Sequence, residues 1–294
     1  MIRLLRSEAF RLQRRWMPWV LLLIIAVGAV LVYLLIYTSV NAQLQAIRNG
    51  TIPDQPGTRT AIEQTVRQLR PDRVQAFGVS IVNGIGSIML IVLAASHIGT
   101  EFGWGTLRTL LAHGASRSGF FVAKLATLLI FAAVFALVGV VASIAGSYLT
   151  AAIGGLETSP GVDLPAVASA AARGVFAFVP YMALAVVFAV WSRSAGAGIA
   201  AGLVAYFAES IVAGILVSLN RDFATVVNYG LSRNVASITR VTVGASVGPA
   251  EGGAGSVAST LPDQGQAALV LVTYTALFLA LAWWRLRARD VTVS

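Results

Sequence analysis

Six long apolar stretches, separated by short polar or charged segments, dominate the pattern of hydrophobic and polar positions. They cover approximately residues 17–37, 74–97, 120–149, 169–192, 196–219 and 266–284. About 20 apolar residues in an α-helix are enough to cross the hydrocarbon core of a bilayer, so each stretch is predicted to be a transmembrane helix. The pattern predicts an all-α polytopic membrane protein in which residues 1–294 form a single transmembrane domain.

Three of these stretches carry further information about packing. The second contains the small and polar run GVSIVNGIGSIM. Small residues let neighbouring membrane helices approach closely, so we expect this span to pack against protein rather than lipid. Only the segment SRSAG separates the fourth stretch from the fifth, which predicts a tight helical hairpin.

Residues 1–16 show a different pattern, with apolar side chains at helical steps of three and four. The apolar positions are Ile2, Leu5, Ala9, Leu12 and Trp16. We predict an amphipathic helix in the membrane interface that ends near Pro18. Its anchors at anionic headgroups would be Arg3, Arg6, Arg11, Arg14, Arg15 and Trp16. The alternative is an ordinary positively charged flank without a folded helix.

Composition and charge agree with a membrane protein. Charged residues make up 11% of the chain, whereas soluble proteins have about 25%. A formal net charge of +9 would suggest nucleic acid as the partner of a soluble protein. In a membrane protein, cations mark cytoplasmic ends, so we expect a lipid bilayer and no nucleic acid. The arginines of the N-terminal arm and of the final RLRARD place both termini in the cytoplasm.

A polar segment, residues 98–118, interrupts the apolar pattern after the second span. In this orientation it is cytoplasmic, and Thr100 could cap a short helix that begins at Glu101 and ends at Gly114. Such a helix, with its apolar and polar sides, could dock in a groove of another protein. It could equally lie against its own bundle.

The stretch from Glu101 to Lys124 resembles the cytoplasmic segment of type-2 ABC exporter permeases. The matching positions are Glu101, Gly105, Thr106, Leu107, Leu110, Leu111, Ser116, Arg117 and Lys124, and Ala123 stands where glycine is frequent. The C-terminal WWRLRARDV is also similar to the end of the last span in that family. Bacitracin-resistance, sodium-export and copper-related permeases form the subgroup that the chain resembles most.

The resemblance implies a division of labour between two kinds of subunit. This chain would be the permease of an ATP-driven exporter in a bacterial cytoplasmic (inner) membrane, paired with a second copy of itself. A separate ABC ATPase, holding ATP and Mg²⁺, would dock on residues 98–118 as a coupling helix. Its contact residues would be Glu101, Phe102, Gly105, Thr106, Leu107, Arg108, Leu110, Leu111, Ser116 and Arg117. The substrate would be amphiphilic or hydrophobic: a drug, a peptide or a lipid-like molecule.

Motifs for chemistry are missing from the sequence. It has no G-x-x-x-x-G-K-[ST] and no H-E-x-x-H, and it has no cysteine. We therefore expect no catalytic residue, no metal site and no cofactor in this chain, and we do not expect it to be an enzyme.

Glu209 is the one ionisable residue well inside a predicted span, which makes it a candidate functional site. It could line the transport path, with Arg173 as a possible partner and Asn83 and Ser87 as further path candidates. It could instead be a carboxyl group hydrogen-bonded to a neighbour. A stand-alone secondary transporter or channel with Glu209 as its coupling site is the alternative function, and a membrane-embedded enzyme or assembly factor is a third. Residues 220–265 are predicted to form an extracytoplasmic loop that could fold back as a re-entrant or interfacial segment.

Overall fold

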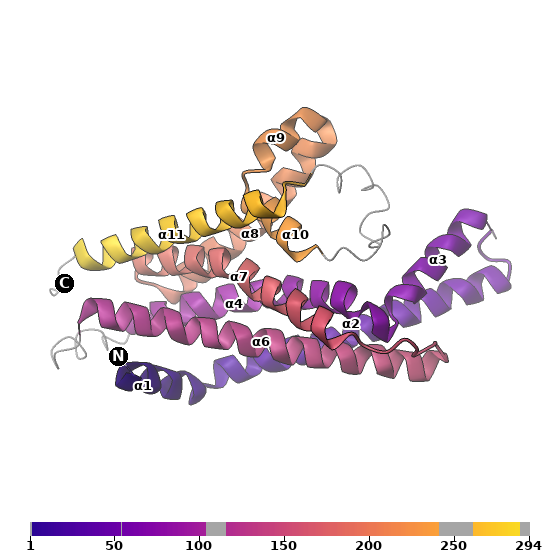
Figure 1. Ribbon diagram of the computed structural model, residues 1–294, viewed down its shortest axis with the longest axis horizontal. Helices are drawn as coiled ribbons and strands as arrows, with labels where there is room; N and C mark the ends of the chain where they lie inside the picture. The colour runs from indigo at the N-terminus through magenta and orange to yellow at the C-terminus, as the bar shows by residue number, and fades with distance from the viewer. Residues whose placement is uncertain (1, 54, 104–115, 241–260, 289–294) are drawn as a thin grey trace.

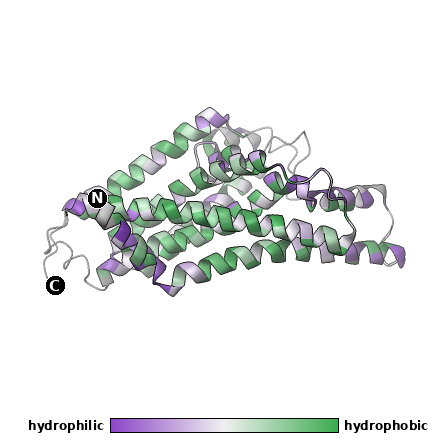
Figure 2. Cartoon of the chain, turned by 60° about the horizontal axis from the view of Figure 1, so that its bottom comes forward, coloured by the Kyte–Doolittle hydropathy of each residue, from purple (hydrophilic) through white to green (hydrophobic). Residues whose placement is uncertain are grey.

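The computed structural model describes residues 2–53, 55–103, 116–240 and 261–288. Within these ranges the chain is helical and contains no β-strand. The molecule is an elongated bundle in which the middle of the long helices is apolar and polar residues gather toward the two ends (Figures 1 and 2). We call the end that carries helix α1 the N-terminal end and the opposite one the far end.

Six helices of the described chain are long and apolar enough to cross a membrane. They are α2 (Trp16–Arg48), α4 (Val79–Gly103), α6 (Arg117–Gly154), α7 (Leu164–Ser192), α8 (Ala195–Leu219) and α11 (Gln264–Ala288). All six coincide with predicted spans, and the link of Arg193 and Ser194 between α7 and α8 confirms the predicted hairpin. Ser194 begins α8 by accepting a hydrogen bond from the amide of Ala197 at 3.3 Å.

The helices run past several predicted ends. Helix α2 continues to Arg48 and is followed by α3 (Pro56–Gln68), so that the two form a helical hairpin projecting at the far end (Figure 1). The segment between the first two predicted spans is therefore largely helical. A 3₁₀ turn (Pro71–Arg73) and a π-helical turn (Val74–Gly78) then lead directly into α4.

Helix α4 lies in the middle of the bundle and contacts α2, α6, α7 and α8. This confirms the expectation that the second span packs against protein. One close approach is at Gly99, where a Cβ atom would come within 2.5 Å of the Ala195 backbone. Because only glycine fits there, the small-residue pattern of α4 permits this helix to meet the turn between α7 and α8.

The segment after α8 folds back onto the bundle at the far end. It comprises a 3₁₀ turn (Arg221–Phe223), α9 (Ala224–Val227) and α10 (Leu231–Thr239). Helix α10 packs against α7, α8 and α11, with Leu231 and Ile238 buried. This part of the predicted loop is therefore a packed helical cap.

Two predictions at the N-terminal end are wrong in detail. Helix α1 (Ile2–Gln13) stops before Arg14, so Trp16 begins α2 and is 85% exposed instead of continuing the apolar stripe. Thr100 does not cap a new helix, because α4 continues through it to Gly103. Its hydroxyl instead donates to the backbone oxygen of Ser96, one turn earlier, at 2.7 Å.

Candidate functional site

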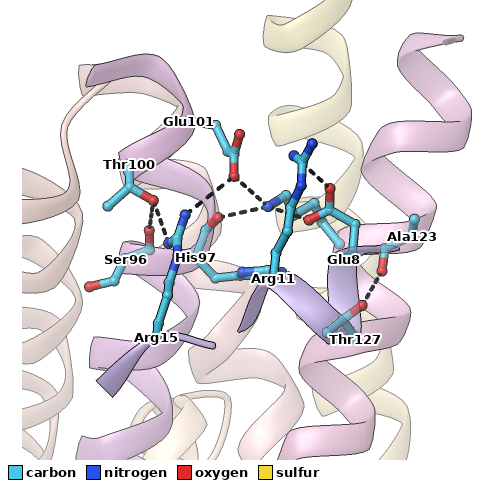
Figure 3. A network of polar contacts seen from close by, with 10 residues as sticks. Glu8, Arg11, Arg15, Ser96, His97, Thr100, Glu101, Ala123 and Thr127 are labelled. Carbon is cyan, nitrogen blue, oxygen red and sulfur yellow. Dashed lines mark hydrogen bonds and ion pairs between the residues drawn. The ribbon is translucent and has the colours of Figure 1, made fainter. Parts of the chain in front are cut away.

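A buried cluster of charged side chains joins three helices at the N-terminal end of the bundle (Figure 3). Glu8 comes from α1, Glu101 from the last turn of α4 and Lys124 from the second turn of α6. Their exposures are 2%, 2% and 1%. Charged groups this deeply buried must be paired, because removing an isolated charge from water costs several kcal/mol or more.

Lys124 is the centre of the cluster. Its Nζ atom donates to Glu101 Oε1 at 2.8 Å and to the backbone oxygen of His97 at 3.3 Å. Nζ also lies 2.6 Å from Glu8 Oε2, an ion pair whose alignment is not that of a directed hydrogen bond. The ammonium group is thus shared by two carboxylates, one from the N-terminal arm and one from the second span.

Two arginines at the end of the N-terminal arm surround this centre. Arg15 Nη2 lies 3.6 Å from Glu101 Oε1, and Arg15 Nη1 donates to Thr100 Oγ1 at 2.9 Å. Arg11 Nη1 lies 3.6 Å from Glu8 Oε1. Three cations therefore face two carboxylates, and the attraction between them holds the N-terminal arm against α4 and α6.

The local sequence explains why this cluster forms. Glu8 shares the inward face of α1 with Leu12, which is 2% exposed. Helix α4 carries its polar groups through a continuous last turn, so that Glu101 and the backbone oxygen of His97 point toward the same cation. Among the described residues, neither imidazole nitrogen of the buried His97 has a hydrogen-bond partner.

Glu101 of the cluster lies within the predicted coupling segment, residues 98–118, and Lys124 lies shortly after it. Helix α4 ends at Gly103 and α6 begins at Arg117, after Ser116 accepts a hydrogen bond from the Gly119 amide at 3.0 Å. Lys124 and Glu101 therefore join the two helices that enter and leave residues 104–115. A displacement of this segment would act on both helices and, through Glu8, on α1.

The structure describes four of the predicted coupling residues. Glu101 is buried in the cluster and Phe102 packs against the hydrophobic core. Ser116 caps α6, and Arg117 Nη1 donates to the backbone oxygen of Arg287 at 3.0 Å. The others lie outside the described residues: Gly105, Thr106, Leu107, Arg108, Leu110 and Leu111.

The predicted path residues do not converge on one site. Asn83 packs against α7, where a Cβ atom on Gly174 would collide with its Oδ1. Ser87 donates to the backbone oxygen of Asn83 at 2.7 Å, within the same helix.

Glu209 and Arg173 both lie toward the far end. Glu209 Oε1 accepts the backbone N–H of Ser232 at 2.7 Å and so caps the first turn of α10. Arg173 donates to the backbone oxygen of Arg240 at 3.4 Å, and no ion pair joins it to Glu209 among the described residues.

The sequence patterns do not single out Glu8, and Lys124 is matched only through the family resemblance. One signal was available, because Lys124 is the sole lysine of the chain and stands in the apolar run FFVAKLATLL. A lysine predicted to be buried calls for carboxylate partners. Glu8 was the less obvious partner, because the stripe of α1 was defined by apolar residues alone.

The chain is thus a polytopic helical membrane protein. Its buried charged cluster holds the N-terminal arm against the ends of two spans. The model of the family described as ABC-2 family transporter protein matches residues 3–291. The chain belongs to this family and is the membrane subunit of an ABC transporter; the ATPase is a partner subunit. This confirms the resemblance to type-2 ABC permeases. A search of individually curated proteins gave no match.

Proposed function

We propose that this chain is the permease of an ATP-driven exporter, which works as a homodimer in the bacterial cytoplasmic membrane. Its N-terminal end, with both termini, faces the cytoplasm, and residues 98–118 receive the movement of the ATPase. The substrate is amphiphilic or hydrophobic. ATP and Mg²⁺ belong to the ATPase subunit.

The observation that carries the coupling proposal is the contact of Lys124 with both Glu8 and Glu101. Because α1, α4 and α6 share these ion pairs, a movement of the docked ATPase that displaces residues 104–115 would move all three helices together. Breaking a buried pair by removing one partner costs about 3–5 kcal/mol, so the three helices resist separation. Three helices joined in this way can transmit a movement from a docked partner together.

The alternative function, a stand-alone carrier coupled through Glu209, is not favoured. The Glu209 carboxylate already has a structural task, because it accepts the N–H of Ser232 at the start of α10. A member of this family also works with an ATPase subunit, so it needs no coupling ion as its source of energy.

The coupling proposal is tested on the chain copurified with its ATPase. Leu107→Ala/Leu110→Ala/Leu111→Ala should lower substrate-stimulated ATP hydrolysis or complex formation. The matched control replaces three exposed leucines of α2, Leu23, Leu31 and Leu35, with alanine. Transport into liposomes by the chain alone, without ATPase or ATP, would refute the proposal.

The orientation is tested separately, because the natural chain contains no cysteine. Gln13→Cys places a thiol on an exposed position of α1, and Gln43→Cys places one near the far end of α2. A membrane-impermeant maleimide added to intact cells should label only Gln43→Cys. Labelling of only Gln13→Cys would reverse the proposed orientation.

A further inference from the structure

A second group of cations lies at the N-terminal end, where α6 begins and α7 and α11 end. Phe121 of α6 packs on Trp283 of α11, with ring centroids 5.7 Å apart. The guanidinium group of Arg285 lies over the ring of Trp191, near the end of α7, 5.2 Å from its centroid. These contacts bring the ends of three helices to one corner of the bundle.

The corner carries cations without described carboxylates to balance them. Arg193 ends α7, and Arg285 and Arg287 lie in the last turn of α11. The described acidic side chains at this end are Glu8 and Glu101, and both contact Lys124. Among the described residues, the buried Arg285 Nε has no hydrogen-bond acceptor. A bound anion would complete this group.

The last carbonyl groups of α11 do not explain the surplus of charge. Cations often stabilise a helix C-terminus by binding its free carbonyl groups. Here Arg117 takes that role, with Nη1 3.5 Å from the oxygen of Leu286 and 3.0 Å from that of Arg287. Arg285 instead turns to the aromatic face of Trp191.

The aromatic residues indicate the depth of this corner in the membrane. Trp191 and Trp284 are 49% and 59% exposed and stand at the ends of apolar spans. Tryptophan is enriched at the boundary between the hydrocarbon core and the headgroups. The guanidinium group over Trp191 is therefore at the depth of lipid phosphates.

We propose that the corner of Trp191, Arg193 and Arg285 is a binding site for an anionic phospholipid. The headgroup phosphate pairs with the two guanidinium groups, and the acyl chains lie along the apolar surfaces of α7 and α11. Basic pockets between transmembrane helices bind anionic lipid headgroups in this way. The bound lipid joins the ends of α7 and α11.

The test measures which lipids remain bound to the full chain, with and without its ATPase. The protein is equilibrated in nanodiscs of phosphatidylglycerol and phosphatidylcholine, extracted in mild detergent and analysed by mass spectrometry. We expect enrichment of phosphatidylglycerol and a loss of about fivefold in that enrichment for Arg285→Gln. Arg193→Gln should act in the same direction, and Arg285→Lys should retain part of the enrichment.

Arg48→Gln is the control, since Arg48 is an exposed arginine in the last turn of α2 and lies outside the proposed site. It should leave the enrichment close to that of the unchanged protein. An equal loss in Arg48→Gln would mean diffuse attraction and would overturn the site. If inorganic phosphate displaces phosphatidylglycerol from the protein, the site binds free anions and the proposal is overturned. The proposal is also overturned if the Arg285→Gln protein keeps the lipid but no longer binds the ATPase.

Discussion

The Nζ atom of Lys124, on α6, lies 2.6 Å from Oε2 of Glu8, on α1, and both side chains are almost fully buried. This contact means that the N-terminal arm is not simply spread on the bilayer surface. One face of α1 is fastened into the protein by an ion pair, while Phe10, on another face, remains 55% exposed. The arm therefore belongs to the same mechanical unit as the ends of α4 and α6.

Lys124→Met should destabilise the protein strongly. The substitution keeps the length of the side chain but leaves Glu8 and Glu101 buried without their shared cation, at an expected cost of about 3–5 kcal/mol. The midpoint of thermal unfolding in detergent, followed by size-exclusion chromatography with fluorescence detection, should fall. Arg15 and Arg11 are too distant, at 3.6 Å from these carboxylates, to replace the ammonium group fully.

The control for Lys124→Met removes the stranded charges as well. In the triple variant Lys124→Met/Glu8→Gln/Glu101→Gln, no carboxylate remains at the centre, and much of the lost stability should return. An equal fall of the unfolding midpoint in the single and triple variants would show that burial of charge is not the cause.

Glu8→Gln should affect coupling more than assembly. The amide has nearly the shape of the carboxylate but lacks its charge, while Glu101 still pairs with Lys124. Losing about 1.5 kcal/mol of a charge-assisted contact predicts a fall of about tenfold in substrate-stimulated ATP hydrolysis, if α1 moves with the coupling segment. Copurification with the ATPase should be unchanged.

A second acid-to-amide change serves as the control for Glu8→Gln. Glu63→Gln removes an exposed carboxylate on α3, at the far end, where it pairs only loosely with Arg67 at 3.9 Å. It should leave ATP hydrolysis unaltered. If Glu8→Gln behaves in the same way, α1 has no part in coupling.

The spans could be predicted from the sequence because the bilayer imposes both length and apolar character on each of them. The packing of α4 could also be predicted, because small residues in a membrane helix favour close contact with other helices over contact with lipid. The position at which α4 ends could not be predicted. Thr100 is a residue type that often caps helices, but here α4 continues through it. Arg15 donates to Thr100, and Lys124 donates to Glu101. Those partners come from distant parts of the chain, which local patterns do not reveal.

Gly99→Ala should disturb the junction between α4 and the turn that joins α7 to α8. The new methyl group would meet the backbone of Ala195 at 2.5 Å, and a backbone cannot rotate aside as a side chain can. Overpacking of this kind costs about 1–3 kcal/mol, so the unfolding midpoint should fall. Gly84→Ala is the control in the same helix, because nothing lies within 4 Å of its Cβ position. Equal losses in both variants would contradict the role of the Ala195 contact.

Glu209 and α10 give the last prediction, at the far end of the molecule. The N-cap residue of α10 is Gly230, which has no side chain to accept a hydrogen bond, and Glu209 of α8 supplies the missing acceptor for Ser232 N at 2.7 Å. A carboxylate at this position also stabilises the positive end of the helix dipole. The contact therefore holds the helical cap onto α8.

Glu209→Ala should release α10, whereas Glu209→Gln should retain most of the contact through its amide oxygen. Capping interactions of about 1–2 kcal/mol correspond to a 5- to 30-fold change in the population of an open state. Ser237→Cys, at a position only 3% exposed on α10, reports this opening as the rate of maleimide labelling in the otherwise cysteine-free chain. Ser210→Ala, beside Glu209 on α8, is the control and should leave the rate unchanged. Equal labelling rates with and without the Glu209→Ala substitution would mean that α10 is held by its packing against α7 and α11 instead.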